Sequence, residues 1–281
     1  MRKKLKVLVV DDSYVFRKML SAGLSSDPAI ESVITAEDPF DARDKIIEFQ
    51  PDVMTCDVEM PKMNGIEFIR KLLPQYMLPV VVVSSVSKAV LDAMNAGAVD
   101  FVVKPEVQTV KDVKAFIDEV VLKVKIASTA KVCIGTPDSH FHGVQVPIKP
   151  SGLNEKEYDR KLIAIGASTG GTEAIYSILM KLPSKCPGIV IVQHIPPVFS
   201  KMFADRLNDS TQFSVKEAED GDFVESGKVL VAPGDRHLKI VKIGERYRTE
   251  CFKGERINGH CPSVDILFDS VAVSAGANAM G

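Results

Sequence analysis

The amino-acid sequence predicts an α/β protein with two domains, each built around a parallel β-sheet. Short apolar runs alternate with helical stretches in both halves of the chain, and polar side chains stand directly after several of those runs. The length of 281 residues corresponds to about two domains. Strand–helix repeats require a parallel sheet with right-handed crossovers, so the carboxyl ends of the strands meet along one edge.

The first domain, predicted over residues 1–126, shows a strand–helix pattern that repeats five times. Its clearest strands are the apolar runs at 7–10, 53–56, 80–83 and 100–103. A helix at 110–124 closes the domain, because Phe116, Val120 and Val124 recur at helical spacing.

Polar side chains follow these strands in a set order. Asp11 and Asp12 follow the first run, Asp57 the second, Ser84 the third and Lys104 the fourth. Any one of them alone is typical of a helix cap or a turn, but the ordered set indicates a site. Carboxylates are ligands for Mg²⁺, which offsets their repulsion so that one can attack a phosphorus atom. The sequence predicts metal ligation by the aspartates, and contacts from the hydroxyl and the lysine to the phosphoryl oxygens.

These motifs resemble the receiver domain of response regulators over about residues 5–125. They are Val9-Val10-Asp11-Asp12-Ser13, Cys56-Asp57-Val58-Glu59-Met60-Pro61-Lys62-Met63-Asn64-Gly65, Val83-Ser84-Ser85 and Val103-Lys104-Pro105. The resemblance implies a flavodoxin-like fold with a five-stranded parallel sheet, Asp57 as phosphoacceptor and a histidine kinase as phosphodonor. It also implies Mg²⁺ as cofactor, phosphate sensing by Ser84 and Lys104, and a cis peptide bond before Pro105.

Composition narrows the range of partners. A net charge of −2 gives no electrostatic argument for nucleic acid. No apolar run approaches the length that crosses a bilayer, so we expect no membrane insertion. The five cysteines lack Cys-x-x-Cys spacing, which favours reduced thiols in a cytoplasmic protein.

A polar stretch with scattered Pro and Gly, residues 127–159, is predicted to be a linker. His140 and His142 lie there, and two nitrogens without a third ligand favour exposed histidines over a metal site. The second domain is predicted over 160–281, again with a largely parallel sheet. Its expected elements are strands at 162–165 and 188–193, helices at 172–182 and 199–207, a β insertion within 213–241, and a helix capped by Ser263 that runs to 274.

A second candidate site lies at the strand ends of this domain. Ser168 stands in the glycine-rich turn Gly166–Gly171, and His194 ends the next strand. A hydroxyl within reach of an imidazole is the minimum for an activated serine nucleophile, and the helix start offers N–H groups to an oxyanion. Such a turn also suits a nucleotide phosphate, but a full G-x-G-x-x-G and the ribose-binding acid are missing. The turn fits G-x-S-x-G, yet the histidine follows the serine after only one strand–helix unit, whereas the catalytic residues of α/β-hydrolases occur in the chain order Ser, acid, His.

The second domain resembles the catalytic domain of chemotaxis protein-glutamate methylesterases, the CheB family. The matching motifs are Ile165-Gly166-Ala167-Ser168-Thr169-Gly170-Gly171, Val192-Gln193-His194-Ile195-Pro196, Ala232-Pro233-Gly234-Asp235-Arg236-His237 and Pro262-Ser263-Val264-Asp265-Ile266-Leu267-Phe268. The resemblance implies a serine carboxylic-ester hydrolase without a cofactor, with Ser168 as nucleophile and His194 as general base. Its substrates would be methylated glutamates of chemoreceptors, and a second activity would be glutamine deamidation. The unphosphorylated receiver would cover the catalytic cleft.

The resemblance places the third catalytic residue, an Asp in a Met-Gly-x-Asp-Gly motif, beyond Gly281. Asp265 and Asp269 are the nearest acids, and they match no catalytic position. We therefore expect a natural protein that continues past this point and completes the sheet and the triad. The alternative is a non-enzymatic response regulator whose inactive esterase-like domain binds receptors or the kinase.

Overall fold

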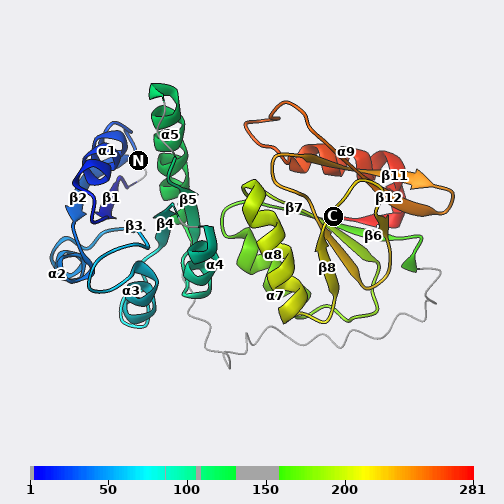
Figure 1. Ribbon diagram of the computed structural model, residues 1–281, viewed down its shortest axis with the longest axis horizontal. Coiled ribbons are helices and arrows are strands. Elements are labelled where there is room, and N and C mark those ends of the chain that lie inside the picture. The colour runs from blue at the N-terminus through cyan, green and yellow to red at the C-terminus, as the bar shows by residue number, and fades with distance from the viewer. Residues whose placement is uncertain (1–2, 86, 106–108, 131–157) are drawn as a thin grey trace. The chain divides into compact units, whose positions relative to one another are not determined.

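The computed structural model describes residues 3–85, 87–105, 109–130 and 158–281. It divides into two compact units, with the division between Gly143 and Val144. Most of the predicted linker, with His140 and His142, lies outside the described residues. Each unit contains a parallel sheet with helices packed against it (Figure 1). The prediction of two α/β units with parallel sheets is therefore confirmed.

The first unit contains a five-stranded parallel sheet of order β2-β1-β3-β4-β5. Its elements are β1 Leu5–Val10, α1 Tyr14–Ser25, β2 Ile30–Ala36, α2 Pro39–Phe49, β3 Val53–Cys56, α3 Gly65–Leu72, β4 Val80–Ser84, α4 Ser87–Asn95, β5 Asp100–Val103 and α5 Val110–Ala127. This is the flavodoxin-like order, in which a ligand crevice forms where the strand order reverses, between β1 and β3. The predicted strands and the closing helix are confirmed.

The central strands β1, β3 and β4 are mostly apolar and largely buried, because both faces of the sheet are covered. Figure 1 shows α1 and α5 on one side of the sheet and α2, α3 and α4 on the other. Leu20 and Leu24 of α1 pack with Phe116 and Val120 of α5 against the strand valines. Helices α1, α2, α3 and α5 begin where a side chain accepts a backbone N–H group, as Asp38 does for α2.

The second unit also contains a five-stranded parallel sheet, of order β13-β6-β7-β10-β8. A three-stranded antiparallel sheet of order β11-β12-β9 packs beside it. The elements are β6 Leu162–Ala167, α7 Gly171–Leu179, β7 Gly188–Gln193, α8 Pro197–Ser210, β8 Ser214–Glu217, β9 Phe223–Val224, β10 Lys228–Val231, β11 His237–Ile243, β12 Arg246–Phe252, α9 Val264–Ser274, the 3₁₀ turn η1 Gly276–Asn278, and β13 Ala279–Met280. A buried core joins β6, β7 and β10 to β11, β12 and α9.

The prediction of a β insertion within 213–241 is partly wrong. β8 and β10 fall in that range but belong to the parallel sheet, because β10 is a buried apolar run that pairs with β7 on one side and β8 on the other. Only β9 and β11 leave the main sheet, and β12, which sequence reasoning missed, completes their antiparallel sheet.

The expected cap of the helix at 263–274 needs a correction. Ser263 holds the N-cap position of α9, but its side chain makes no capping hydrogen bond. Its backbone N–H instead donates to Nδ1 of the buried His237 at 3.2 Å. The tertiary contact satisfies the Ser263 N–H, which the N3 side chain would accept in a capping box, and it does not cap the first N–H groups of the helix.

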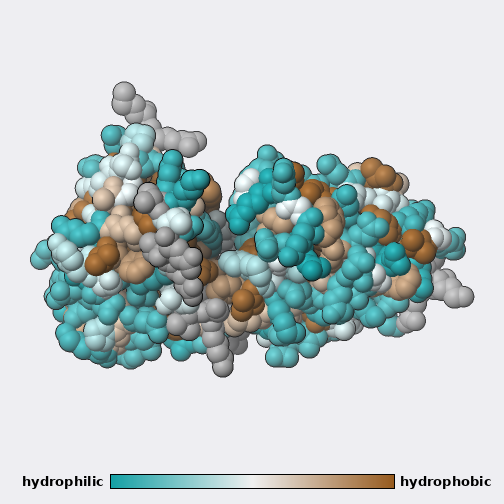
Figure 2. Space-filling view, turned by 45° about the horizontal axis from the view of Figure 1, so that its top comes forward, coloured by the Kyte–Doolittle hydropathy of each residue, from teal (hydrophilic) through white to brown (hydrophobic). Residues whose placement is uncertain are grey.

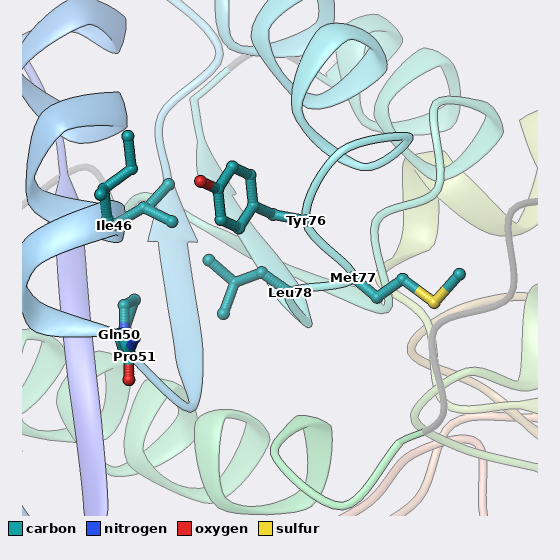
Figure 3. A pocket seen from close by; sticks show the side chains of 7 residues that line it. Ile46, Gln50, Pro51, Tyr76, Met77 and Leu78 are labelled. Carbon is teal, nitrogen blue, oxygen red and sulfur yellow. The ribbon is translucent and has the colours of Figure 1, made fainter.

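The surface is mostly polar, with separate apolar patches (Figure 2). One pocket of about 340 Å³ lies beside the end of α2, lined by Ile46, Ile47, Gln50, Pro51, Tyr76, Met77 and Leu78 (Figure 3). It contains none of the candidate site residues. No helix in the described part of the chain has the length and apolar character that a bilayer crossing requires.

Candidate functional sites

The predicted acidic cluster forms at the carboxyl ends of β1 and β3. Carboxylate oxygens of Asp11, Asp12 and Asp57 lie within 4.8 Å of one another. The parallel pairing of the two strands brings Val10 beside Cys56, and the Asp57 N–H donates to the Val10 carbonyl at 2.9 Å. Two of the acids are buried, since Asp11 is 1% and Asp57 4% exposed, while Asp12 faces solvent.

Lys104 follows β5 and places its ammonium group between the two buried acids. Its Nζ lies 2.8 Å from Oδ2 of Asp11 and also contacts Oδ2 of Asp57. Burial raises the pKa of the Asp57 carboxyl, and the contact with Lys104 opposes that rise. Burial works against the ammonium as well, but the two carboxylates outweigh it and raise the pKa of Lys104. The lysine is therefore held protonated against the cluster.

The donor set fits Mg²⁺. Three carboxylates face one ammonium group, so negative charge remains to be neutralised, and all the donor atoms are hard oxygens. Glu59 follows the cluster, and its N–H donates to Oδ1 of Asp57 at 3.3 Å. The buried Ser84 ends β4 beside Lys104, whose N–H donates to the Ser84 carbonyl at 3.0 Å. All the predicted residues of this site thus lie at one edge of the sheet.

Sequence reasoning missed one residue of this edge and placed one peptide bond wrongly. Arg17 of α1 donates from Nη1 to the carbonyl oxygens of Asp11 at 2.6 Å and Asp12 at 2.8 Å, which holds the loop that carries both acids.

The cis peptide bond expected before Pro105 is not found. Among the described residues the cis bond precedes Pro262, and trans is the ordinary form of an X-Pro bond.

The second unit brings Ser168 and His194 together. Ser168 follows β6 and His194 follows β7, and these strands pair in parallel up to Ala167 and Gln193. The His194 N–H donates to the Ala167 carbonyl at 3.1 Å, which fixes the two strand ends. The His194 Nδ1 lies 3.2 Å from the Ser168 Oγ. A serine hydroxyl and a base are thus within hydrogen-bond distance at an exposed edge.

The His194 nitrogen that faces Ser168 is Nδ1, and this determines the tautomer in which His194 can act as a base. Nδ1 can accept the hydroxyl proton only if it carries none itself, so the neutral ring must hold its proton on Nε2. An acid that orients the ring would then bind at Nε2. Asp265, the acid of the first turn of α9, accepts a hydrogen bond from Asn258 Nδ2 at 2.8 Å.

Glycines allow the sharp turn that follows Ser168. Gly170 has φ of +74° at the start of α7, and the Gly171 N–H donates to the Ser168 carbonyl at 2.8 Å. A Cβ at Gly171 would lie 2.1 Å from the Gln193 Oε1. No larger residue fits there without displacing the Gln193 side chain.

Gln193 is a further residue of this site that sequence reasoning missed. Its Nε2 donates to the carbonyl oxygens of Ser168 at 2.9 Å and His194 at 3.3 Å. One buried amide therefore ties together the loops that carry the serine and the histidine. The signal in the sequence was a lone polar residue at the end of an otherwise apolar strand.

Comparisons with known proteins match each of the two units to a family. The family model for the response regulator receiver domain matches residues 7–114, and that for the CheB methylesterase matches residues 163–281. A protein-glutamate methylesterase/protein-glutamine glutaminase of Syntrophomonas wolfei is 51% identical over 99% of this chain and 80% of its own length. A protein of the same name from Escherichia coli is 45% identical over 99% of this chain and 79% of its own length. The solved methylesterase catalytic domain of Thermotoga maritima is 38% identical, over 42% of this chain and 64% of its own, with a TM-score of 0.41.

The fold and the two sites define a response regulator with a serine-hydrolase output domain. Its receiver domain carries the acidic cluster, and its second domain carries the serine–histidine pair. The chain belongs to the CheB methylesterase family.

Proposed function

We propose that this chain is a phosphorylation-activated protein-glutamate methylesterase in which Ser168 is the nucleophile and His194 the general base. Its substrates are the methylated glutamates of chemoreceptors in bacterial-type chemotaxis. The observation that carries the assignment is the distance of 3.2 Å between Ser168 Oγ and His194 Nδ1. Both residues lie in the domain that the methylesterase family model matches.

The reaction begins when Ser168 Oγ attacks the ester carbonyl carbon and its proton passes to His194 Nδ1. The carbonyl oxygen becomes an oxyanion, which the N–H groups at the start of α7 stabilise, since the first N–H groups of a helix lack intrahelical partners. The intermediate collapses, the C–O bond to the methoxy group breaks, and His194 returns the proton to release methanol. Water then attacks the acyl-serine, again with His194 as base, and leaves a carboxylate.

A second activity uses the same groups. The named relatives are also protein-glutamine glutaminases. A side-chain amide differs from the ester only in its leaving group, so the same serine and histidine would release ammonia from a glutamine and leave a glutamate. We include this deamidation in the proposed function.

The receiver domain controls this activity through Asp57. A carboxylate oxygen of Asp57 attacks the phosphorus of a phosphohistidine on a chemotaxis histidine kinase, and the P–N bond breaks to leave the kinase imidazole. Lys104 and Ser84 bind the transferred oxygens. Asp11 and Asp12 would hold Mg²⁺ with Asp57, and the metal supplies neutralising charge to the phosphoryl oxygens. We propose the cytoplasm as the location of this protein, because the cysteines of the described residues are free, as is usual in that compartment.

Covalent labelling tests the site assignment. The purified chain is treated with an alkyl fluorophosphonate, digested, and mapped by mass spectrometry. We expect one adduct, on Ser168, which forms much more slowly in His194→Ala. An adduct that forms on another serine, or at the same rate without His194, would overturn the assignment. Ser177→Ala, which removes an exposed hydroxyl from α7, serves as the control.

A further inference from the structure

The imidazole rings of His194 and His260 lie face to face. Their centroids are 3.7 Å apart and their planes differ by 7°. We propose that His260 is a positioning residue, which stacks on His194 and holds its ring in the plane that directs Nδ1 at Ser168. The proposal rests on the function assigned to His194 above and adds a residue to that site.

The parallel planes define what this contact can do. The nitrogen lone pairs and N–H bonds of an imidazole lie in the plane of its ring, so rings in a parallel stack do not point them at one another. The contact is therefore packing and not a hydrogen bond or a proton relay. The π face of His260 also lies against the positive charge that develops when His194 accepts the serine proton.

A tight hairpin carries His260. Ile257 and His260 exchange two backbone hydrogen bonds, each of 3.0 Å, around Asn258 and Gly259. These two residues have φ of +52° and +83°, as a type I′ turn requires. The Asn258 side chain donates to Asp265 in the first turn of α9 at 2.8 Å, which anchors the tip of the hairpin.

A buried histidine, His237, anchors the two ends of the same segment. His237 is 1% exposed, and its Nε2 lies 2.8 Å from the Glu255 carbonyl oxygen on one side of the hairpin. Its Nδ1 accepts the Ser263 N–H on the other side. The segment that presents His260 is thus fixed at its tip and at both ends. A ring mounted this firmly can restrict the rotation of its neighbour.

The expected effect concerns orientation and not substrate binding. His194 follows the end of β7, and two rotatable bonds connect its ring to the backbone. If the stack removes unproductive rotamers, its loss lowers the rate constant of the chemical step and leaves the binding constant unchanged. A residue that only maintained the fold would lower stability, without a separate effect on the ring of His194.

The test uses the full chain with His260→Ala and His260→Phe. Fluorophosphonate labelling of Ser168 gives the maximal rate and the half-saturating concentration, and ¹⁵N spectra of labelled histidines report the tautomer of His194. We expect His260→Ala to lower the maximal rate by about tenfold, the order of the energy of one aromatic pair. Its His194 signals should move towards a mixture of tautomers. His260→Phe keeps a flat ring and should restore both readouts to near wild-type values.

Ile257→Ala is the matched control, since it truncates the other side chain at the hairpin bridge and leaves the stack in place. Wild-type rate and tautomer signals in His260→Ala would overturn the proposal, as would a His260→Phe variant no better than His260→Ala. A wild-type chain that is not labelled on Ser168 would instead overturn the proposed function. The ¹⁵N signals of His194 in the variants would still test the stack in that case.

Discussion

The side-chain amide of Gln193 donates to the carbonyl oxygen of Ser168 at 2.9 Å. The same nitrogen reaches the carbonyl of His194 at 3.3 Å, so the backbones of the proposed nucleophile and base share one buried donor. The distance between the catalytic side chains therefore depends on a residue that takes no part in the chemistry.

Gln193→Glu should separate these loops, because a carboxylate places an acceptor against two carbonyl oxygens. We expect a loss of roughly 1–3 kcal/mol in the free energy of unfolding, the cost of buried polar groups left unpaired. Urea unfolding measures it. Gln212→Glu is the control, since Gln212 is exposed and donates to one carbonyl. Equal losses in the two variants would contradict the role given to Gln193.

Asp57→Asn should abolish phosphorylation of the receiver domain, because an amide oxygen is a poor nucleophile toward phosphorus. The measurement is incorporation of label from acetyl phosphate in the presence of Mg²⁺. Asp118→Asn, which changes an exposed acid on α5, should label like the wild type. Undiminished labelling of Asp57→Asn would show that another residue is the phosphoacceptor.

The same substitution should raise the thermal stability of the metal-free protein near neutral pH. The raised pKa of Asp57 means that the folded state binds its proton more tightly than the unfolded state does. The carboxyl of Asp57 therefore lowers stability progressively as the pH rises from its ordinary pKa of 3.8 through its raised pKa in the folded state. The advantage of Asp57→Asn should be largest at pH 7.5 and shrink towards pH 4, in a series of melting temperatures. It should also shrink when Mg²⁺ is added, and an advantage independent of both pH and Mg²⁺ would contradict this account.

Lys104→Met should have the opposite effect. The pKa of Lys104 in the folded protein is raised above its ordinary value of 10.5. Its contribution to stability is therefore complete at pH values below 10.5 and is lost only as the pH rises through the pKa of the folded state. At pH 7 without metal we expect a loss of about 2 kcal/mol, less than for a fully buried ion pair because water reaches part of the site. Urea unfolding with and without Mg²⁺ measures the loss and its recovery by the metal. A variant as stable as the wild type would show that the lysine does not stabilise the cluster.

Most of the receiver domain could be predicted from the sequence, because its central strands are short, mostly apolar and followed by chemically distinctive residues. In the second unit, β8 and β10 could be found as strands but not assigned to a sheet, since only tertiary pairing decides which sheet a strand joins. β12 carried a signal that was overlooked. Tyr247, Thr249 and Cys251 are buried and alternate with more exposed neighbours, and Gly244 with φ of +61° marks the turn before them.

The two candidate sites differ in what the sequence could reveal. The residues at strand ends were predictable, because parallel strands bring their carboxyl ends to one edge. Arg17 and His260 were not, since each acts through a contact that exists only after folding, and Gln193 was marked only as a polar residue at the end of an apolar strand. The Asn258-Gly259 pair indicates a hairpin, but nothing in it indicates that the next residue stacks on a histidine more than sixty positions earlier.

Methanol release from methylated chemoreceptor membranes tests the central claim most directly. The protein is assayed with acetyl phosphate and Mg²⁺, beside Ser168→Ala and the control Ser177→Ala. We predict release by the wild type and by Ser177→Ala, and a fall of at least about a thousandfold in Ser168→Ala, as expected on removal of a serine nucleophile. Release by Ser168→Ala at the wild-type rate would contradict the assignment of this serine and of the site built around it.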